Sequence, residues 1–202
     1  MFLSSTEAAN ELGVSARHMR RQAASGRVAS RRYGNVHVIA ERQLQMMQRT
    51  THRGRPWSDT TKRAALDLLA TGATTELAGS ERSRLKQRLR TVGANVIAGQ
   101  ILPGRTTLRS SSNTSNQAQH VPSIVSELGL SPRGGLGVLI ATNSSLAARR
   151  ARLGVDDEGN IVAIDGNERH TPVLEAIALY AYGDARENAA ASAWLAAAQA
   201  AL

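Results

Sequence analysis

The start of the chain indicates two short helices, each with its own capping residue, joined by a short turn at a glycine. Ser4 and Glu7 form the S-x-x-E pattern of a capping box, in which the serine caps the first turn and the glutamate reaches back. Ser15 is a suitable N-cap for a second helix that runs to about residue 25. Gly13 can end the first helix and reverse the chain. These signals predict two helices joined by a tight turn.

Small and apolar residues favour a close crossing of these helices, as a helix-turn-helix requires. Ala9 lets the first helix approach the second closely. Apolar contacts that would fix the angle between them are expected from Leu12, Val14 and Met19. Gly34-Asn35 then lies between two β-prone stretches, which predicts a β-hairpin. Residues 41–49 are expected to form a further helix.

Positive charge is concentrated in the first half of the chain. The formal net charge is +9, but residues 1–110 hold 19 Lys and Arg against 7 Asp and Glu, whereas residues 111–202 hold 6 against 9. A bias in composition that favours Arg over Lys does not explain why the positive charges avoid the second half. A basic region joined to a mildly acidic one is typical of a phosphate-binding module fused to a protein-binding module.

The second predicted helix carries the residues that DNA recognition requires. In a helix-turn-helix this helix enters the major groove with its N-terminal residues facing the base edges. Arginine suits this position because its guanidinium can bind O6 and N7 of guanine together. A serine at the helix N-terminus is better placed for a phosphate. The candidate DNA-binding residues here are Ser15, Arg17, His18, Arg20 and Arg21.

Residues 3–39 resemble the winged helix-turn-helix of excisionase and MerR-type proteins. The shared pattern consists of Thr6, Ala8-Ala9, Leu12-Gly13-Val14-Ser15, Met19-Arg20-Arg21, Gly26-Arg27-Val28, Arg31-Arg32 and the Gly34-Asn35 turn. The resemblance implies that the second helix reads the major groove and that the hairpin contacts DNA as a wing. It adds Arg27, Arg31 and Arg32 to the candidate DNA-binding residues. The chain departs from the family at Gln22, where Trp or Leu is usual.

An alternative is a helix-turn-helix that serves only packing, dimerisation or docking. The paired arginines and the basic hairpin favour DNA binding, because packing does not require them.

A second basic segment is expected over residues 57–109. Ser58 can cap a helix that ends at Gly72, and another helix over 80–92 carries cations on both flanks of its leucine stripe. We expect a hairpin to follow, with Pro103-Gly104 as its turn. A second winged helix would then contact DNA through Arg82, Lys86, Arg90, Arg105 and Arg109, with Arg84 and Arg88 on the other flank. The equally weighted alternative is an ordinary solvated helix.

The polar residues 110–122 suggest a linker before a C-terminal region over 123–202. There we expect a short helix, a buried strand over GVLIAT, a hairpin over RLGVDDEGNIVAID, and Ala-rich helices interrupted at Gly183. The acidic turn at 156–160 lacks the ligand spacing of a calcium loop. An apolar stripe in these helices is assigned to a local core or to an interface; it comprises Val173, Leu174, Ile177, Leu179, Tyr180, Trp194 and Leu195.

The expected fold class is therefore mainly α with small β-hairpins (α+β). We expect a winged helix-turn-helix over 1–52, a basic helical domain over 57–109, a linker over 110–122 and an interaction or oligomerisation domain over 123–202.

Catalysis has no positive signal in the sequence. The chain has no cysteine, its five histidines are scattered, and its Gly-rich stretch at 132–137 lacks the Lys and Ser/Thr of a phosphate loop. We therefore expect no enzyme, no cofactor and no metal site. No signal peptide and no long apolar run are evident, so a cytoplasmic protein without membrane contact is expected.

A bacterial transcriptional repressor is the favoured function, acting on double-stranded DNA at its own promoter. The order of reader, Arg-rich middle and acidic end resembles the autoregulating antitoxin of an abortive-infection-type toxin–antitoxin system. That resemblance implies a toxin partner or self-association through the C-terminal region. The alternatives are an excisionase-like DNA-bending protein and a non-catalytic interaction adaptor.

Overall fold

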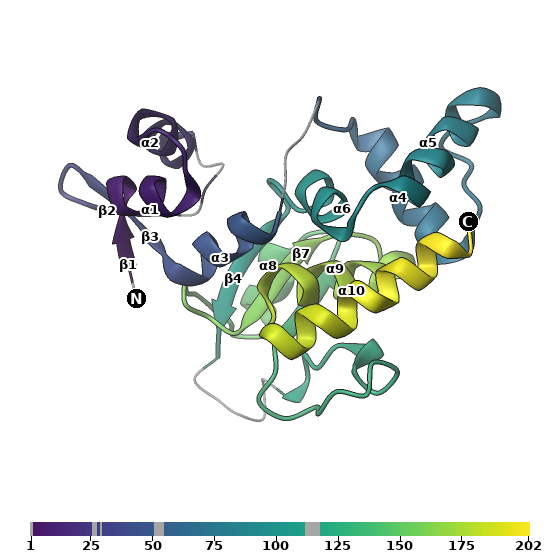
Figure 1. The fold of residues 1–202 in the computed structure, drawn as a ribbon. Helices are drawn as coiled ribbons and strands as arrows, with labels where there is room; N and C mark the ends of the chain where they lie inside the picture. The colour runs from purple at the N-terminus through teal and green to yellow at the C-terminus, as the bar shows by residue number, and fades with distance from the viewer. Residues whose placement is uncertain (1, 26–27, 29, 51–54, 112–117) are drawn as a thin grey trace.

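The computed structural model describes residues 2–25, 28, 30–50, 55–111 and 118–202 of the chain and shows a mixed α/β protein (Figure 1). We call residues 2–50 the N-terminal unit and residues 55–202 the body. The expected linker over 110–122 falls partly outside the described residues, as do Gly26 and Arg27.

The N-terminal unit combines three helices with a three-stranded antiparallel sheet in the order β1-β3-β2. Its elements are β1 (Phe2–Ser4), α1 (Ser5–Leu12), α2 (Ala16–Ala24), β2 (Arg31–Tyr33), β3 (Val36–Ala40) and α3 (Glu41–Arg49). The expected hairpin over β2 and β3 and the expected helix over 41–49 are both confirmed.

The predicted caps set the boundaries of α1 and α2. Ser4 and Glu7 form the complete capping box of α1, and Gly13 ends that helix in the left-handed conformation with φ 64°. The hydroxyl of Ser15 accepts a hydrogen bond from the amide of His18 at 3.2 Å and so caps α2. Only three residues therefore separate the two helices.

A small apolar core holds α1, α2 and α3 against one face of the sheet. Its buried members are Leu3, Ala8, Ala9, Met19, Val28, Ile39 and Leu44. Ala8 and Ala9 have almost no exposed surface, so the helices approach closely, as the small residues predicted.

The body consists of helices around a four-stranded sheet. Its elements are α4 (Asp59–Thr71), α5 (Gly79–Thr91), α6 (Ala94–Ile101), β4 (Thr106–Ser110), η1 (Ser123–Val125), β5 (Gly137–Ala141), α8 (Ser144–Arg150), β6 (Gly154–Val155), β7 (Ile161–Asp165), η2 (Glu168–His170), α9 (Thr171–Tyr182) and α10 (Ala185–Ala200). The predicted cap at Ser58 and the predicted stops at Gly72 and Gly183 are confirmed.

The sheet order, β5-β7-β4-β6, overturns both hairpins expected in this region. Residues 94–101 form helix α6 instead of a strand, so the prediction of a hairpin with its turn at Pro103-Gly104 is wrong. β6 and β7 do not pair with each other, because β4 lies between them and is antiparallel to both. β5 completes the sheet by pairing parallel to β7.

One apolar core spans both halves of the body, so the expected boundary between residues 57–109 and 123–202 is wrong. This core contains Trp57 and the buried faces of α4, α5 and α6, and both long C-terminal helices, α9 and α10, contribute to it as well. α9 lies at its centre and is buried on nearly every side. The apolar stripe of α9 and α10 is accordingly a local core, and in it only Tyr180 and Trp194 are partly exposed.

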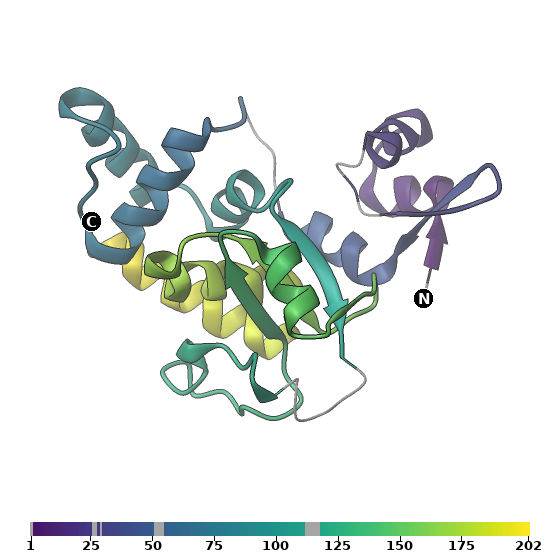
Figure 2. The ribbon, with the colours of Figure 1, turned by 180° about the vertical axis from the view of Figure 1, so that it is seen from behind.

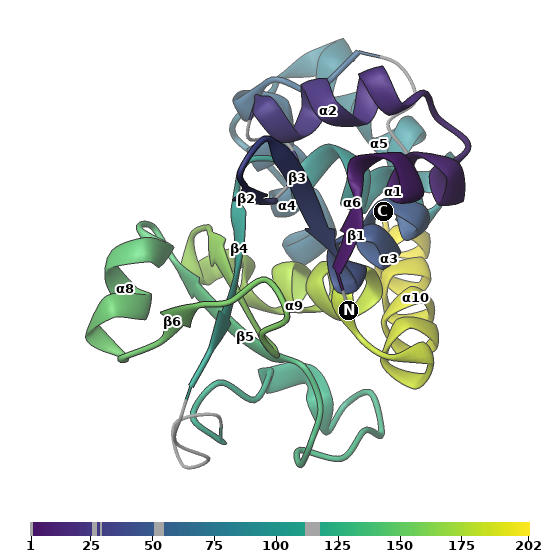
Figure 3. The same cartoon turned by 90° about the vertical axis from the view of Figure 1, so that its left-hand side faces the viewer.

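The N-terminal unit rests on the body through α3 and the hairpin (Figure 3). The guanidinium of Arg49 donates to the carbonyl of Gly183, and the hydroxyl of Tyr180 donates to the carbonyl of Arg49 at 3.2 Å. Arg42 donates to the carbonyl of Gly159 in the turn before β7. These bonds set the direction in which α2 faces, away from the body.

Candidate nucleic-acid interface

Among the predicted site residues, those on the outer face of α2 lie closest together in the structure. Met19 and Ala23 point into the core of the N-terminal unit, which leaves Arg17, Arg20 and Arg21 exposed on the opposite side. The helical period alone produces this separation, because residues three and four apart share a face.

Short contacts along the helix hold the side chains of the α2 arginines. Among the described residues, no carboxylate forms an ion pair with any of them. Nε of Arg20 donates to the carbonyl of Ala16 at 3.3 Å. The ring of half-buried His18 lies between Arg21 and Gln22, with each ring nitrogen 3.5 Å from a side-chain nitrogen of one neighbour. The charges of the α2 arginines are therefore available to an anionic ligand.

The two arginines expected in the wing lie on opposite faces of the N-terminal sheet. Arg32 pairs with His37 in the register of β2 and β3, and strand alternation puts it on the face that carries Leu3 and Ile39, where the helices pack. Arg31 is opposite Val38 and points to the other face.

Arg31 is held by the acidic turn of the body. Its guanidinium lies 2.9 Å from Asp157 and 3.5 Å from Asp156, and it also lies over the ring of Phe2. The hydrogen bond to Asp157 raises the pKa of Arg31 above its ordinary value. Arg32 instead bonds to its own turn, donating to the carbonyl of Gly34 at 2.8 Å. Of the two, Arg32 is the one that lies on the side of α2.

The second predicted set of site residues does not form one surface. Arg82 and Arg90 are exposed on α5, and Lys86 is half-buried there. Arg105 is paired with Asp59 at 3.3 Å. Arg109 is buried in β4, where its Nε donates to the hydroxyl of Thr107. The expectation that Arg105 and Arg109 belong to a second wing is therefore wrong.

A further exposed group of arginines was missed by sequence reasoning. Arg149, Arg150 and Arg152 lie at the end of α8. The run of arginines at 149–152 could have drawn attention to this group, but it occurs in the acidic half of the chain.

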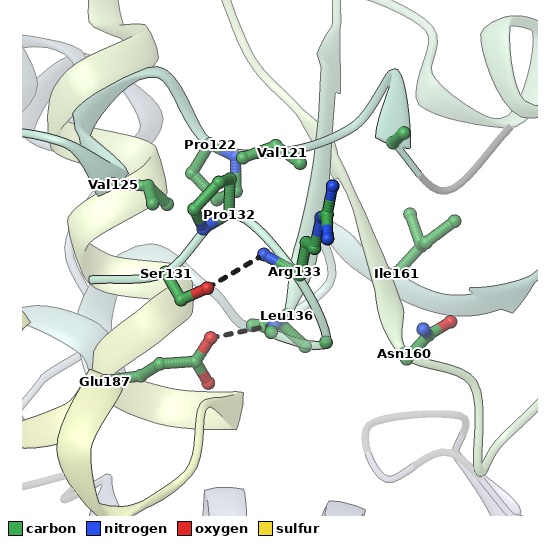
Figure 4. A pocket seen from close by; sticks show the side chains of 14 residues that line it. Val121, Pro122, Val125, Ser131, Pro132, Arg133, Leu136, Asn160, Ile161 and Glu187 are labelled. Atoms are coloured by element: carbon green, nitrogen blue, oxygen red, sulfur yellow. Dashed lines mark hydrogen bonds between the residues drawn. The ribbon is translucent and has the colours of Figure 1, made fainter. Parts of the chain in front are cut away.

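The body also contains a cavity of about 300 Å³ beneath the Gly-rich loop (Figure 4). Pro122, Val125, Pro132 and Leu136 contribute apolar walls, and the Arg133 side chain extends beside them. The carboxylate of Glu187 at its edge is already engaged, since it accepts hydrogen bonds from the amides of Leu136 and Asp184, each at 2.8 Å. The loop and Glu187 thus anchor the start of α10.

Within the described ranges, no three or more His, Asp or Glu side chains gather as metal ligands would. No helix in the same part of the chain combines the length and hydropathy needed to cross a membrane.

A solvent-facing arginine helix above a small three-stranded sheet is the feature that defines this interface. Comparison of the chain with protein-family models, with curated proteins and with solved structures finds no match. The geometry of the molecule is therefore the basis for assigning its function.

Proposed function

We propose that this protein is a sequence-specific DNA-binding transcriptional repressor, in which the N-terminal unit acts as a winged helix-turn-helix and α2 as its recognition helix. The observation that carries the proposal is the outer face of α2, where Arg17, Arg20 and Arg21 project from a helix that Met19 locks to the core. Packing of the N-terminal unit does not need these charges.

The leading end of α2 suits the DNA backbone as well as the bases. The Ser15 hydroxyl is occupied as a cap, so the first backbone amides of α2 are the donors for a phosphate there. Arg17 lies in the first turn, from which a guanidinium reaches the base edges in the major groove. Arg21 follows one turn later, and His18 beside it limits its rotamers.

Arg32 is the wing residue that this proposal retains. It lies on the helix side of the sheet, whereas Arg31 is paired with the body in the present arrangement. Arg27 belongs to the same proposed set on the strength of its place in the sequence motif.

The body is proposed to be non-catalytic and to bind a protein, as the antitoxin of a cytoplasmic toxin–antitoxin pair would. The support for this part is the separation of charge along the chain. Because the apolar stripe of α9 and α10 is buried, a partner or second copy would use another surface of the body, such as the exposed Leu146 and Val155.

Electrophoretic mobility on the DNA upstream of its own gene, against a scrambled duplex at two salt concentrations, tests the proposal. Arg17→Ala and Arg21→Ala are each expected to weaken specific binding by about 1–3 kcal/mol if the residue reads a base. Arg186→Ala on α10 serves as a control, since it removes an exposed arginine far from α2. Failure of the purified protein to prefer its upstream DNA would contradict the proposed function, and equal losses on both duplexes would reassign the residue to a phosphate.

A further inference from the structure

Helix α5 carries more positive charge than α2. It contains five cations, Arg82, Arg84, Lys86, Arg88 and Arg90, against the single acid Glu81. Leu85 and Leu89 bury its inner edge, and Arg82, Arg84 and Arg90 are exposed.

The placement of these cations works against the helix itself. Arg82 and Lys86, Lys86 and Arg90, and Arg84 and Arg88 are like-charge pairs at i,i+4 spacing, and such pairs destabilise a helix. Cations in the last turn interact favourably with the helix dipole, which accounts for Arg88 and Arg90 but not for Arg82. A helix that is merely solvated gains from alternating signs along its surface.

Three arginines elsewhere in the body have anionic partners, whereas those of α5 do not. Arg63 is paired with Glu76, Arg105 with Asp59 and Arg169 with Asp67. Among the described residues, no cation of α5 lies in an ion pair with a carboxylate, and Arg88 lies over the ring of Trp57.

α5 is fixed in place and lies on the same side of the molecule as α2. Gln199 of α10 donates to the carbonyls of Leu89 and Val92 and so ties the end of α5 to the body. In two opposite views, α2 and α5 lie at the two ends of the upper side (Figures 1 and 2). A straight duplex laid along that side would meet both helices.

We propose that α5 is a second DNA contact, which binds the phosphates of the same duplex whose bases α2 reads. The inference rests on the proposed function. Successive cations at i,i+4 lie about 6 Å apart along the helix axis, and duplex DNA offers one phosphate charge per ~1.7 Å of its own axis. Because phosphates carry no sequence information, α5 supplies affinity and orientation without specificity.

A matched pair of triple variants tests the assignment. Arg82, Arg84 and Arg90 are changed to Gln in one protein, and Arg149, Arg150 and Arg152 to Gln in the other, so each loses three exposed charges. Binding is measured by fluorescence anisotropy on a labelled upstream duplex and on a scrambled duplex over a series of KCl concentrations.

The α5 variant is expected to bind both duplexes at least tenfold more weakly, with a salt slope reduced by about 2–3, as loss of three phosphate contacts requires. The α8 variant should change affinity less than threefold. Equal effects of the two variants, or no effect of the α5 variant, would overturn the inference. If only Arg17→Ala and Arg21→Ala abolish specific binding, the proposed function stands and the α5 contact does not.

Lys86→Glu separates binding from stability. It converts two repulsive i,i+4 pairs into attractive ones, so the melting temperature should rise or stay constant while DNA affinity falls at least fivefold. Affinity is measured well below the melting temperature, so that the protein is folded throughout. Unchanged affinity would overturn the inference.

Discussion

Arg152 has a backbone conformation that L-residues rarely adopt. Its φ is 54°, and it follows α8 at the point where the amide of Leu153 donates back to the carbonyl of Ala148. This is the left-handed end of a helix, a position that glycine usually fills. An arginine retained there costs conformational energy.

We therefore expect Arg152→Gly to stabilise the protein by about 1 kcal/mol, since glycine adopts the left-handed conformation freely. Arg150→Gly is a control with the opposite expected sign. Arg150 lies within α8, where a glycine destabilises the helix by about 1 kcal/mol. Urea unfolding monitored by circular dichroism measures both. A destabilised Arg152→Gly protein would show that the side chain of Arg152 contributes more than its backbone costs.

His120 makes stability depend on pH. Burial holds the pKa of its ring below the ordinary value of 6.5, and Nε2 is buried without a hydrogen-bond partner among the described residues. As the pH falls below 6.5, the unfolded chain therefore takes up this proton before the folded chain does, and the free energy of unfolding decreases.

His120→Gln should consequently flatten the loss of stability between about pH 6.5 and pH 5. Urea midpoints measured across this range for both proteins give the comparison. Parallel curves for the two proteins would mean that His120 does not contribute.

At the scale of elements, local signals were sufficient wherever a cap or a turn sets the boundary. Ser4, Ser15 and Ser58 each begin the helix that they were expected to begin. The pairing of strands that lie far apart in the chain leaves no signal in the local sequence. Residues 94–101 are mostly apolar and short enough for a strand, but they form helix α6, which packs against α9.

A buried polar network joins α4 to η2. Asp67 accepts a hydrogen bond from Thr74 at 2.9 Å and lies 2.7 Å from Nε2 of His170 and 2.9 Å from Arg169. Asp67 and His170 are both buried, so their polar atoms depend on partners within this network.

Asp67→Ala is expected to destabilise the body by on the order of 3 kcal/mol, because each buried partner left unsatisfied costs about 1–3 kcal/mol. The free energy of urea unfolding measures this loss. Asp59→Ala, which removes an exposed carboxylate of the same helix, should have a much smaller effect. Similar losses for the two variants would contradict a stabilising role of the network.

At the scale of the molecule, the sequence predicted the exposure of candidate site residues only where they lie on a single helix. The period of α2 separates Met19 from the exposed arginines without any tertiary information. The partner of Arg31 lies 126 residues away in the sequence, in a turn that the sequence predicted only as the end of a hairpin. Arg109 is buried because β4 is an inner strand, which depends on strands formed much later in the chain.

Under the proposed function, the contact between Arg31 and the acidic turn would oppose DNA binding, since the turn places negative charge beside the proposed wing. Changing both Asp156 and Asp157 to Asn should therefore tighten binding to the upstream duplex roughly two- to fivefold, the size expected from a partly exposed ion pair at the surface. The gain should shrink at high salt. Weaker binding by this variant in the anisotropy titration would show that the acidic turn orients the N-terminal unit for DNA.

The position of β4 has a consequence for how the protein is made. Both of its neighbours are synthesised later, β7 about fifty residues after β4 itself. At roughly 5–20 residues per second, β4 leaves the ribosome several seconds before it can pair. During that interval both of its edges are open to other chains. We therefore expect the nascent protein to depend on chaperones until the α9 region has been translated.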